Sequence, residues 1–132
     1  MAKTQAKAPG SSSSRVTTLK KRSEFQRVRK GARWATPAFV LEAKERQEEG
    51  RGLPEPRFGF TVTRQVGKAV ERNRIRRRLK AAVGGVAAEH AKADFDYVLI
   101  ARRPALTAEF AGLVSELVKA MGRVHRAPAR AR

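Results

Sequence analysis

Cysteine is absent from the 132-residue sequence, which excludes disulfide bonds, thiolate metal sites and cysteine nucleophiles. Long apolar runs are also absent, because no stretch reaches the roughly eighteen consecutive apolar residues that a membrane-spanning helix needs. Residues 1–14 contain no apolar run of the length found in signal peptides. These absences predict a cytoplasmic protein.

Acidic residues are scarce: 12 Asp and Glu stand against 30 Lys and Arg, which gives a formal net charge of +18. A positive field of this size opposes compaction unless phosphates or counterions neutralise it. Nucleic acid is therefore the leading class of partner, and an anionic membrane surface is the second.

Residues able to hold a catalytic metal are few. Asp94 and Asp96 are the only aspartates, and His90 and His125 are the only histidines. The aspartates precede a predicted strand, where capping of the backbone is their expected role. Neither histidine has a partner at ligand or triad spacing. We therefore expect no catalytic residue and no metal ligand in the protein itself.

The chain has the length of one domain. Residues 1–14 are predicted to be a disordered tail, residues 15–121 the domain, and residues 122–132 a basic C-terminal tail. Hydrophobic patterning predicts an α+β fold with the element order α-β-β-α-β-α. These elements are a helix at 23–30, strands at 38–43 and 58–63, a helix from 69 to the glycine pair at 84–85 with a further helical stretch to about 93, a strand at 97–101 and a helix at 107–121.

Capping residues and glycines set the predicted helix ends. Ser23 and Gln26 have the spacing of a capping box, and Gly31 is expected to end the first helix in a left-handed conformation. The pair at 84–85 is expected to break or end the second helix. Thr107 is the predicted N-cap of the last helix, and Gly122 its predicted end.

Basic residues are concentrated between positions 64 and 80, where eight of them accompany one acid, Glu71, for a local charge of +7. An apolar stripe along the same helix is predicted to face the core. The polar positions fall on two flanks of that stripe, with Arg74 and Arg78 on one of them. The stripe consists of Ile75, Leu79, Ala82 and Val83, and the second flank consists of Asn73, Arg76, Arg77 and Lys80.

Like charges four residues apart destabilise an isolated helix by about 0.2–0.5 kcal/mol per pair, so a phosphate backbone is the better explanation for the cluster. A solvated charged face is the alternative. Arg72 falls on the apolar side of the helix, so its side chain either snorkels to the surface or lies at the helix entrance, where backbone N–H groups favour anions.

The segment 66–80, with Arg72-Asn73-Arg74 at its centre, resembles the signature of the bacterial ribonuclease P protein. The likeness extends to the segments at 25–31, 58–63 and 97–104, and it covers about residues 17–121. It implies a single-domain α-β sandwich like the second domain of ribosomal protein S5, with a left-handed βαβ crossover. It further implies that the protein assists a catalytic RNA in removing the 5′ leader from precursor tRNA, and that this RNA subunit holds the Mg²⁺ and the active site.

The resemblance also implies two sets of binding residues. The first contacts the RNA subunit and comprises Lys68, Arg72, Asn73, Arg74, Arg76, Arg77 and Lys80. The second lines a cleft between the first helix and the sheet, would hold the single-stranded leader, and comprises Lys21, Phe25, Arg29, Val40 and Thr61. Ordinary core packing is the alternative role for Phe25. Relatives commonly place aromatic residues where this chain has Arg29 and Glu42, so leader binding is expected to be more electrostatic here.

The expected partners are therefore the RNA subunit and precursor tRNA, with one protein per RNA and no membrane. A ribosomal or RNA-chaperone protein is the main alternative, because its charge and fold would look alike. A stand-alone nuclease is disfavoured by the shortage of carboxylates. A DNA-binding helix is disfavoured because the basic residues cover two flanks.

Overall fold

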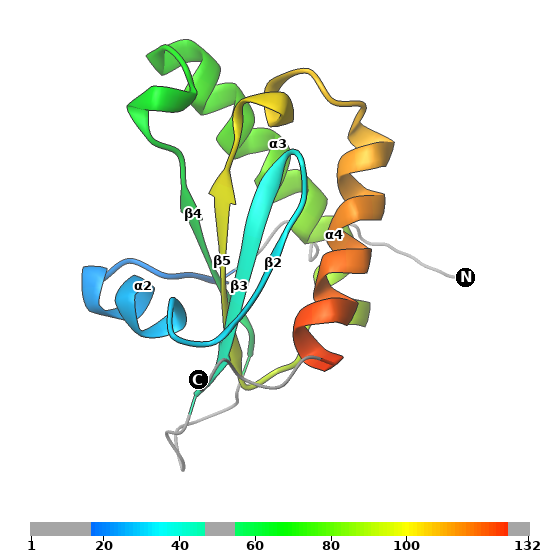
Figure 1. Cartoon of the computed structure of the whole chain (residues 1–132). Coiled ribbons are helices and arrows are strands. Elements are labelled where there is room, and N and C mark those ends of the chain that lie inside the picture. The colour runs from blue at the N-terminus through cyan, green and yellow to red at the C-terminus, as the bar shows by residue number, and fades with distance from the viewer. Residues whose placement is uncertain (1–16, 47–54, 127–132) are drawn as a thin grey trace.

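A five-stranded sheet forms the centre of the residues that the computed structural model describes, 17–46 and 55–126 (Figure 1). The elements follow one another as β1 Thr17–Thr18, α2 Arg22–Val28, β2 Ala32–Ala35, β3 Phe39–Glu45, β4 Arg57–Thr61, the 3-10 turn η1 Arg64–Val66, α3 Ala69–His90, β5 Phe95–Ala101, the 3-10 turn η2 Arg103–Leu106, and α4 Phe110–Arg126.

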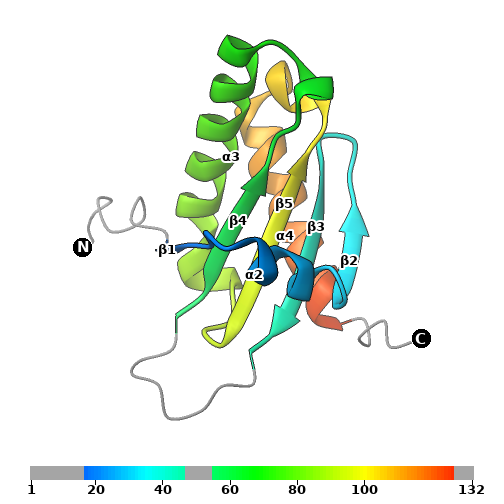
Figure 2. The same cartoon turned by 90° about the vertical axis from the view of Figure 1, so that its left-hand side faces the viewer.

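The strand order across the sheet is β1-β4-β5-β3-β2. β4 and β5 are parallel neighbours joined through α3, whereas β3 pairs antiparallel with both β5 and β2. Thr36 closes the β2–β3 hairpin, because its hydroxyl accepts the Phe39 N–H at 3.1 Å and donates to the Phe39 carbonyl at 2.9 Å. β5 is therefore the middle strand of the sheet, between β4 and β3 (Figure 2).

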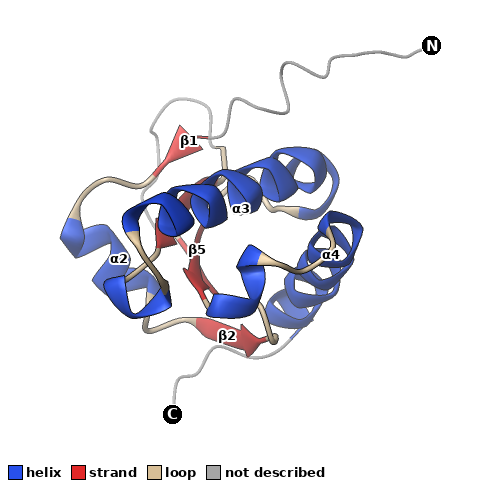
Figure 3. Ribbon diagram, turned by 90° about the horizontal axis from the view of Figure 1, so that it is seen from above, coloured by secondary structure: helices blue, strands red, loops and turns tan. Residues whose placement is uncertain are grey.

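The two faces of the sheet carry different helices. α3 and α4 cover one face, and the short α2 crosses the other (Figures 2 and 3). The main core lies under α3 and α4, where the predicted stripe at Ile75 and Leu79 is confirmed as fully buried. Phe58 and Tyr97 stack beneath these helices with ring centroids 4.8 Å apart. A smaller cluster of Leu19, Val28 and Val98 lies under α2.

The predicted α+β class is confirmed, but the predicted element order is wrong because it lacks β1 and β2. β2 has only four residues, and two of them are alanines. Its conformation depends on pairing with β3 and on packing of Trp34 against the core, which are tertiary effects that local propensity does not reveal.

α2 begins at Arg22, and its capping differs from the prediction. The Glu24 carboxylate accepts the backbone N–H groups of Lys20 and Lys21, whereas Ser23 and Gln26 form no capping box. Gly31 is not left-handed. A Cβ at this position would lie 2.0 Å from the Ala43 carbonyl oxygen, so close approach of β3 is the reason for glycine here.

Glycines do not end the later helices, which corrects two further predictions. α3 runs without a break through 84–85, and Gly84 is buried within it. α4 begins at Phe110, so Thr107 is not its N-cap, and it continues past Gly122 because Val124 extends the buried stripe. Residues 122–126 of the predicted tail are therefore helical, while 1–14 and 127–132 lie outside the described residues.

The three predicted strands exist with shifted ends, and the shift at β5 matters most. This strand begins at Phe95, so Asp96 lies inside it and is fully buried. Within the described ranges, no helix combines the length and the apolar character needed to cross a bilayer.

Candidate nucleic-acid interface

The start of α3 is held by a carboxylate. Glu71 accepts the backbone N–H of Lys68 at 2.9 Å, and its two oxygens accept hydrogen bonds from Arg103 at 2.9 and 3.1 Å. Arg103 also donates to the Val66 carbonyl at 3.0 Å. The Arg103 hydrogen bonds, followed by that of Lys68, lower the pKa of Glu71 to about 2. Glu71 is therefore an anion at neutral pH that ties α3 to the segment after β5.

Gly67 makes this arrangement sterically feasible. A Cβ at position 67 would lie 2.6 Å from a guanidinium nitrogen of Arg103 and 2.6 Å from a carboxylate oxygen of Glu71. Both distances are shorter than real Cβ contacts. A glycine is therefore required between η1 and α3 for the ion pair to close against the backbone.

Arg72 lies at the helix entrance, which settles the two alternatives for this residue. Its Nε donates to the Gly67 carbonyl at 3.1 Å, and its side chain is half-buried. Asn73 accepts a hydrogen bond from Arg76 at 3.0 Å, so these two side chains are oriented by each other. The Lys80 ammonium lies 6.0 Å from the centre of the Phe60 ring.

The structure brings the predicted RNA-subunit residues together along the first three turns of α3 and at its N-cap. Arg72 and Arg76 are half-buried, and the other five side chains are exposed, namely Lys68, Asn73, Arg74, Arg77 and Lys80. Arg78 differs from them. Its guanidinium donates to the carbonyl oxygens of Ala105 and Ala108, so it fixes η2 against α3 instead of forming a flank with Arg74.

The opposite face of the sheet carries two predicted leader residues in one row. Val40 of β3 and Thr61 of β4 are the cross-strand neighbours of the same β5 residue, Ile100. Ile100 is half-buried and was not predicted. Period-two alternation along β5 could have placed it on this face once the strand pairing was known.

Phe25 packs directly on the backbone of Gly59, which pairs with Val98 in the next row of this face. The Cβ of any residue at Gly59 would lie 2.5 Å from the Phe25 ring, and Phe25 also contacts the small cluster that contains Leu19, Val28 and Val98. Its ring is half-buried, so packing accounts for part of its role. Lys21 and Arg29 lie at the two ends of α2 and are exposed.

Glu42 and Arg29, the two departures from the family pattern, lie near each other on this face. Glu42 is buried and forms an ion pair with Arg33 at 3.3 Å. Burial raises the pKa of Glu42, while the charges of Arg33 and Arg29 oppose this effect. The carboxylate of Glu42 therefore opposes the positive charges of Arg33 and Arg29 on this face of the sheet.

Asp96 does not cap a strand, contrary to the prediction, but accepts hydrogen bonds from three arginines. Its Oδ1 accepts from Arg46 at 2.7 Å and from Arg57 at 2.9 Å, and its Oδ2 accepts from Arg27 at 2.6 Å and from Arg57 at 2.8 Å. Burial disfavours the charged carboxylate, but the hydrogen bonds from Arg57, Arg46 and Arg27 outweigh it and lower the pKa of Asp96. The partners lie 39 to 69 residues away, so sequence patterns could not reveal them.

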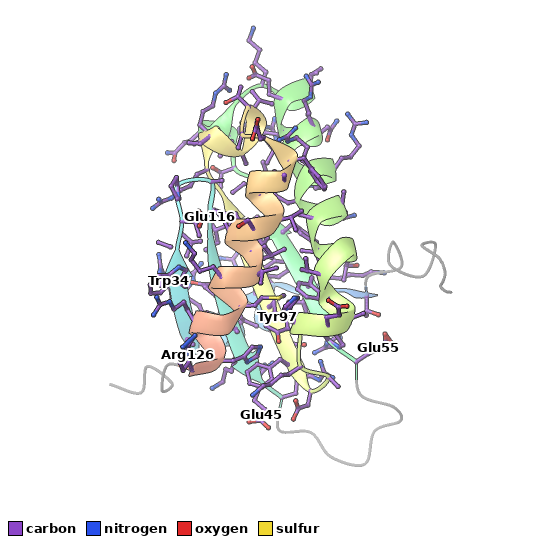
Figure 4. The ribbon with its side chains drawn as sticks, turned by 90° about the vertical axis from the view of Figure 1, so that its right-hand side faces the viewer. Trp34, Glu45, Glu55, Tyr97, Glu116 and Arg126 are labelled. Atoms are coloured by element: carbon purple, nitrogen blue, oxygen red, sulfur yellow. The ribbon has the colours of Figure 1, made fainter. Side chains whose placement is uncertain are left out.

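His125 is also not incidental. Its Nε2 lies 2.7 Å from the Tyr97 hydroxyl, which accepts the Lys92 backbone N–H at 2.8 Å. The His125 ring meets Phe95 edge to face with centroids 4.7 Å apart. Tyr97 lies beneath α4 (Figure 4), and Arg123 of that helix lies 4.9 Å from the centre of the Trp34 ring at the edge of the sheet. Burial and then Lys92 lower the pKa of His125.

The fold and these two faces define a small basic α+β protein with an arginine-rich helix start on one side of its sheet. Residues 14–125 match the family model described as Ribonuclease P. The chain belongs to the family of ribonuclease P protein components, and its role is therefore in tRNA processing within a ribonucleoprotein that contains an RNA subunit.

Named relatives and solved structures agree with this membership. The chain is 44% identical over 110 residues to the Ribonuclease P protein component of Brucella suis, covering 80% of this chain and 78% of the relative. It is 46% identical over 102 residues to that of Bartonella quintana, covering 75% and 76%. The structure of the Staphylococcus aureus RNase P protein matches with a TM-score of 0.66 and 28% identity, covering 83% and 97%. The RNase P protein from Thermotoga maritima, at 22% identity and a TM-score of 0.66, shares the fold over 81% and 96%.

Proposed function

We propose that this chain binds the catalytic RNA of ribonuclease P and the 5′ leader of precursor tRNA, and that it assists endonucleolytic removal of the leader. The observation that carries the proposal is the cationic start of α3, whose backbone is fixed by Glu71 and Arg103. Arg72 and Arg76 are oriented by hydrogen bonds to Gly67 and Asn73, so they lose little conformational entropy when they bind phosphates.

The RNA subunit is the proposed ligand of this α3 surface, through the seven residues from Lys68 to Lys80 named above. Arg72 and Arg74 project from the first two turns of α3, close to the helix N-terminus, whose positive end adds to the potential. Phosphate neutralisation by these residues releases condensed counterions, so affinity should fall steeply with salt. One protein per RNA, in the cytoplasm, is the proposed state.

The leader is the proposed ligand of the α2 face. Phe25 supplies an aromatic surface, the row of Val40, Ile100 and Thr61 supplies apolar and hydroxyl contacts, and Lys21 and Arg29 supply charge at the ends of α2. Unpaired bases can reach such a face, whereas paired bases cannot expose their rings to it. β4 and β5 are parallel, and in Figure 2 both run upward with β5 to the right of β4 and α3 on the far side of the sheet; this arrangement supports the proposed ribosomal protein S5-like topology with its left-handed crossover.

The proposal assigns the reaction and the Mg²⁺ to the RNA subunit. The residues of the protein do not fit a catalytic metal at Asp96, because both oxygens of this buried carboxylate accept hydrogen bonds from arginines. A metal-dependent phosphodiester cleavage needs carboxylates or histidines that remain open to the ion. The protein's part is therefore to bring two polyanions together.

Reconstitution tests this function. The full-length protein, a bacterial ribonuclease P RNA and precursor tRNA are mixed at low Mg²⁺, and 5′ maturation is followed by gel electrophoresis. We expect cleavage that neither the protein nor the RNA achieves alone under these conditions. Cleavage by the protein without RNA, or no stimulation at any protein concentration, would refute the proposal.

A further inference from the structure

Two ion pairs join α2 to the sheet, and α2 supplies the positive partner in one and the negative partner in the other. Arg27 of α2 donates to Asp96 of β5 at 2.6 Å, and Glu24, three residues earlier on α2, accepts from Arg57 of β4 at 3.4 Å. Arg57 also donates to both oxygens of Asp96. The four side chains therefore form a continuous path that leaves α2 and returns to it. Residues three apart share a helix face, so this path fixes the rotation of α2 as well as its distance from the sheet.

A fifth side chain extends the path to the end of the sheet. Arg46 follows β3 and donates to Asp96 Oδ1, to the Glu55 carbonyl at 2.9 Å and to the Ala93 carbonyl at 3.2 Å. One guanidinium thus joins the end of β3 to the segments before β4 and β5. Arg46 thereby anchors Asp96 to the end of the sheet where Glu45 and Glu55 lie (Figure 4).

Apolar packing under α2 is too small to fix the orientation of this helix by itself. Within the residues that the structure describes, the buried cluster there contains only Leu19, Val28 and Val98, with Phe25 and Ile100 at its margin. The hydrophobic effect is also non-directional, so it favours contact without selecting one rotation of the helix. Hydrogen bonds between charged groups are directional, so they select one rotation of α2.

Phe25 lies between the two α2 residues that make these ion pairs. Its ring occupies the space above Gly59, one row away from Thr61 on the same face of β4. A change in the rotation of α2 would move this ring off Gly59. The position of Phe25 therefore depends on Glu24 and Arg27.

We propose that Asp96 and Arg27 are positioning residues for leader binding, which hold α2 so that Phe25 meets an unpaired base of the single-stranded leader. This inference rests on the proposed function of the α2 face. α3 lies on the other side of the sheet (Figure 2), so loss of the path leaves binding of the RNA subunit unchanged.

The test compares Arg27→Met with Arg22→Met. Both variants remove one positive charge from α2, but the Arg22 side chain is exposed and makes no hydrogen bond or ion pair to any residue of 17–46 or 55–126. Holoenzymes are reconstituted with each protein, and the Kd is measured for precursor tRNA with a five-nucleotide leader and for mature tRNA. The ratio of the two constants is the leader gain.

We expect Arg27→Met to reduce the leader gain by about fivefold or more, which corresponds to the lower end of one base–aromatic stack. Arg22→Met should change it by less than about twofold, as for an exposed charge. The Kd of each protein for the RNA subunit, measured on the same samples, verifies folding. An unchanged leader gain in a folded Arg27→Met protein overturns the inference.

A double-mutant cycle separates positioning from simple charge loss. If Arg27 acts through Phe25, Arg27→Met has little further effect on the leader gain in a Phe25→Ala background. Additive effects of the two substitutions overturn the positioning role. A wild-type holoenzyme without any leader gain refutes the proposed leader face itself, which is a different outcome from either result with the variants.

Discussion

The guanidinium of Arg103 meets the carboxylate of Glu71 across 32 residues of sequence, with nitrogen–oxygen distances of 2.9 and 3.1 Å. Because Glu71 also accepts the Lys68 N–H, the start of α3 depends on this carboxylate. We expect Glu71→Gln to weaken binding to the RNA subunit relative to Glu89→Gln, which removes the same charge from an exposed position on the same helix. Filter binding at several salt concentrations measures both. Equal affinities would contradict this role of Glu71.

The same ion pair predicts a pH dependence of stability. The pKa of Glu71 is lowered from 4.5 to about 2, so the folded state favours the carboxylate. A group with a lowered pKa contributes its full stabilisation above the unfolded-state value, here about 4.5, and loses it as the pH falls through about 2. The difference in unfolding free energy between wild type and Glu71→Gln should therefore shrink from pH 5 to pH 2. Urea titrations at pH values across this range measure the difference. A difference that does not change with pH would contradict a stabilising role of the Glu71–Arg103 ion pair.

Substitution by alanine should have opposite effects on stability at two glycines, one before α3 and one within it. Gly67→Ala places a Cβ 2.6 Å from Glu71 and Arg103, so it should separate this ion pair, lower the melting temperature and weaken binding to the RNA subunit. Gly85→Ala meets no atom within 4 Å and lies inside the helix, so it should stabilise the protein by about 0.5–1 kcal/mol. Thermal unfolding followed by circular dichroism compares the two. A Gly67→Ala protein as stable as wild type would show that the backbone accommodates the side chain.

Removing two arginines at the helix start should change the salt dependence of RNA binding. We expect Arg72→Ala combined with Arg74→Ala to weaken binding to the RNA subunit and to reduce the slope of log K against log salt by about 1 to 2. Lys119→Ala combined with Arg126→Ala removes the same charge from exposed positions on α4 and serves as the control. Identical slopes for the two double variants would mean that the whole positive field, and not this surface, attracts the RNA.

His125 should make the protein less stable in mild acid. Its pKa is lowered, so the stability contribution of the neutral ring is complete above the unfolded-state value of about 6.5 and is lost as the pH falls below it. Protonation puts an N–H on both ring nitrogens, and Nδ1 is buried without a hydrogen-bond partner in the described part of the chain. His125→Gln should flatten the change in unfolding free energy between pH 7 and pH 5, whereas His90→Gln should not. The same curve for all three proteins would exclude this role.

Periodicity predicted the elements whose packing is local. Ile75 and Leu79 mark the buried face of α3 by helical spacing alone, and alternation at Phe58 and Phe60 predicted β4. β2 could not be predicted this way, because Trp34 gains its partners only when the hairpin and α4 come together. The prediction that α4 ends at Gly122 was wrong, because burial of Val124 outweighs the cost of a glycine in a helix.

The candidate site was predictable to a different extent on its two faces. The α3 residues are adjacent in sequence, so charge density and the signature around Asn73 identified them together. The α2 face depends on strand pairing. Ile100 becomes visible there only as the shared neighbour of Val40 and Thr61, and Asp96 only as the meeting point of three distant arginines. Such contacts are properties of the folded chain and leave no local pattern.

Alternation along the central strands separates the two faces by residue number. In β4, odd positions such as Gly59 lie toward α2, while even positions such as Phe58 lie toward α3 and α4. In β5 the assignment is reversed, with Val98 toward α2 and Leu99 toward the main core. Successive substitutions along either strand would therefore alter the α2 face and the main core alternately. Each variant on one face could then be compared with the variant at the adjacent position, which alters the other face.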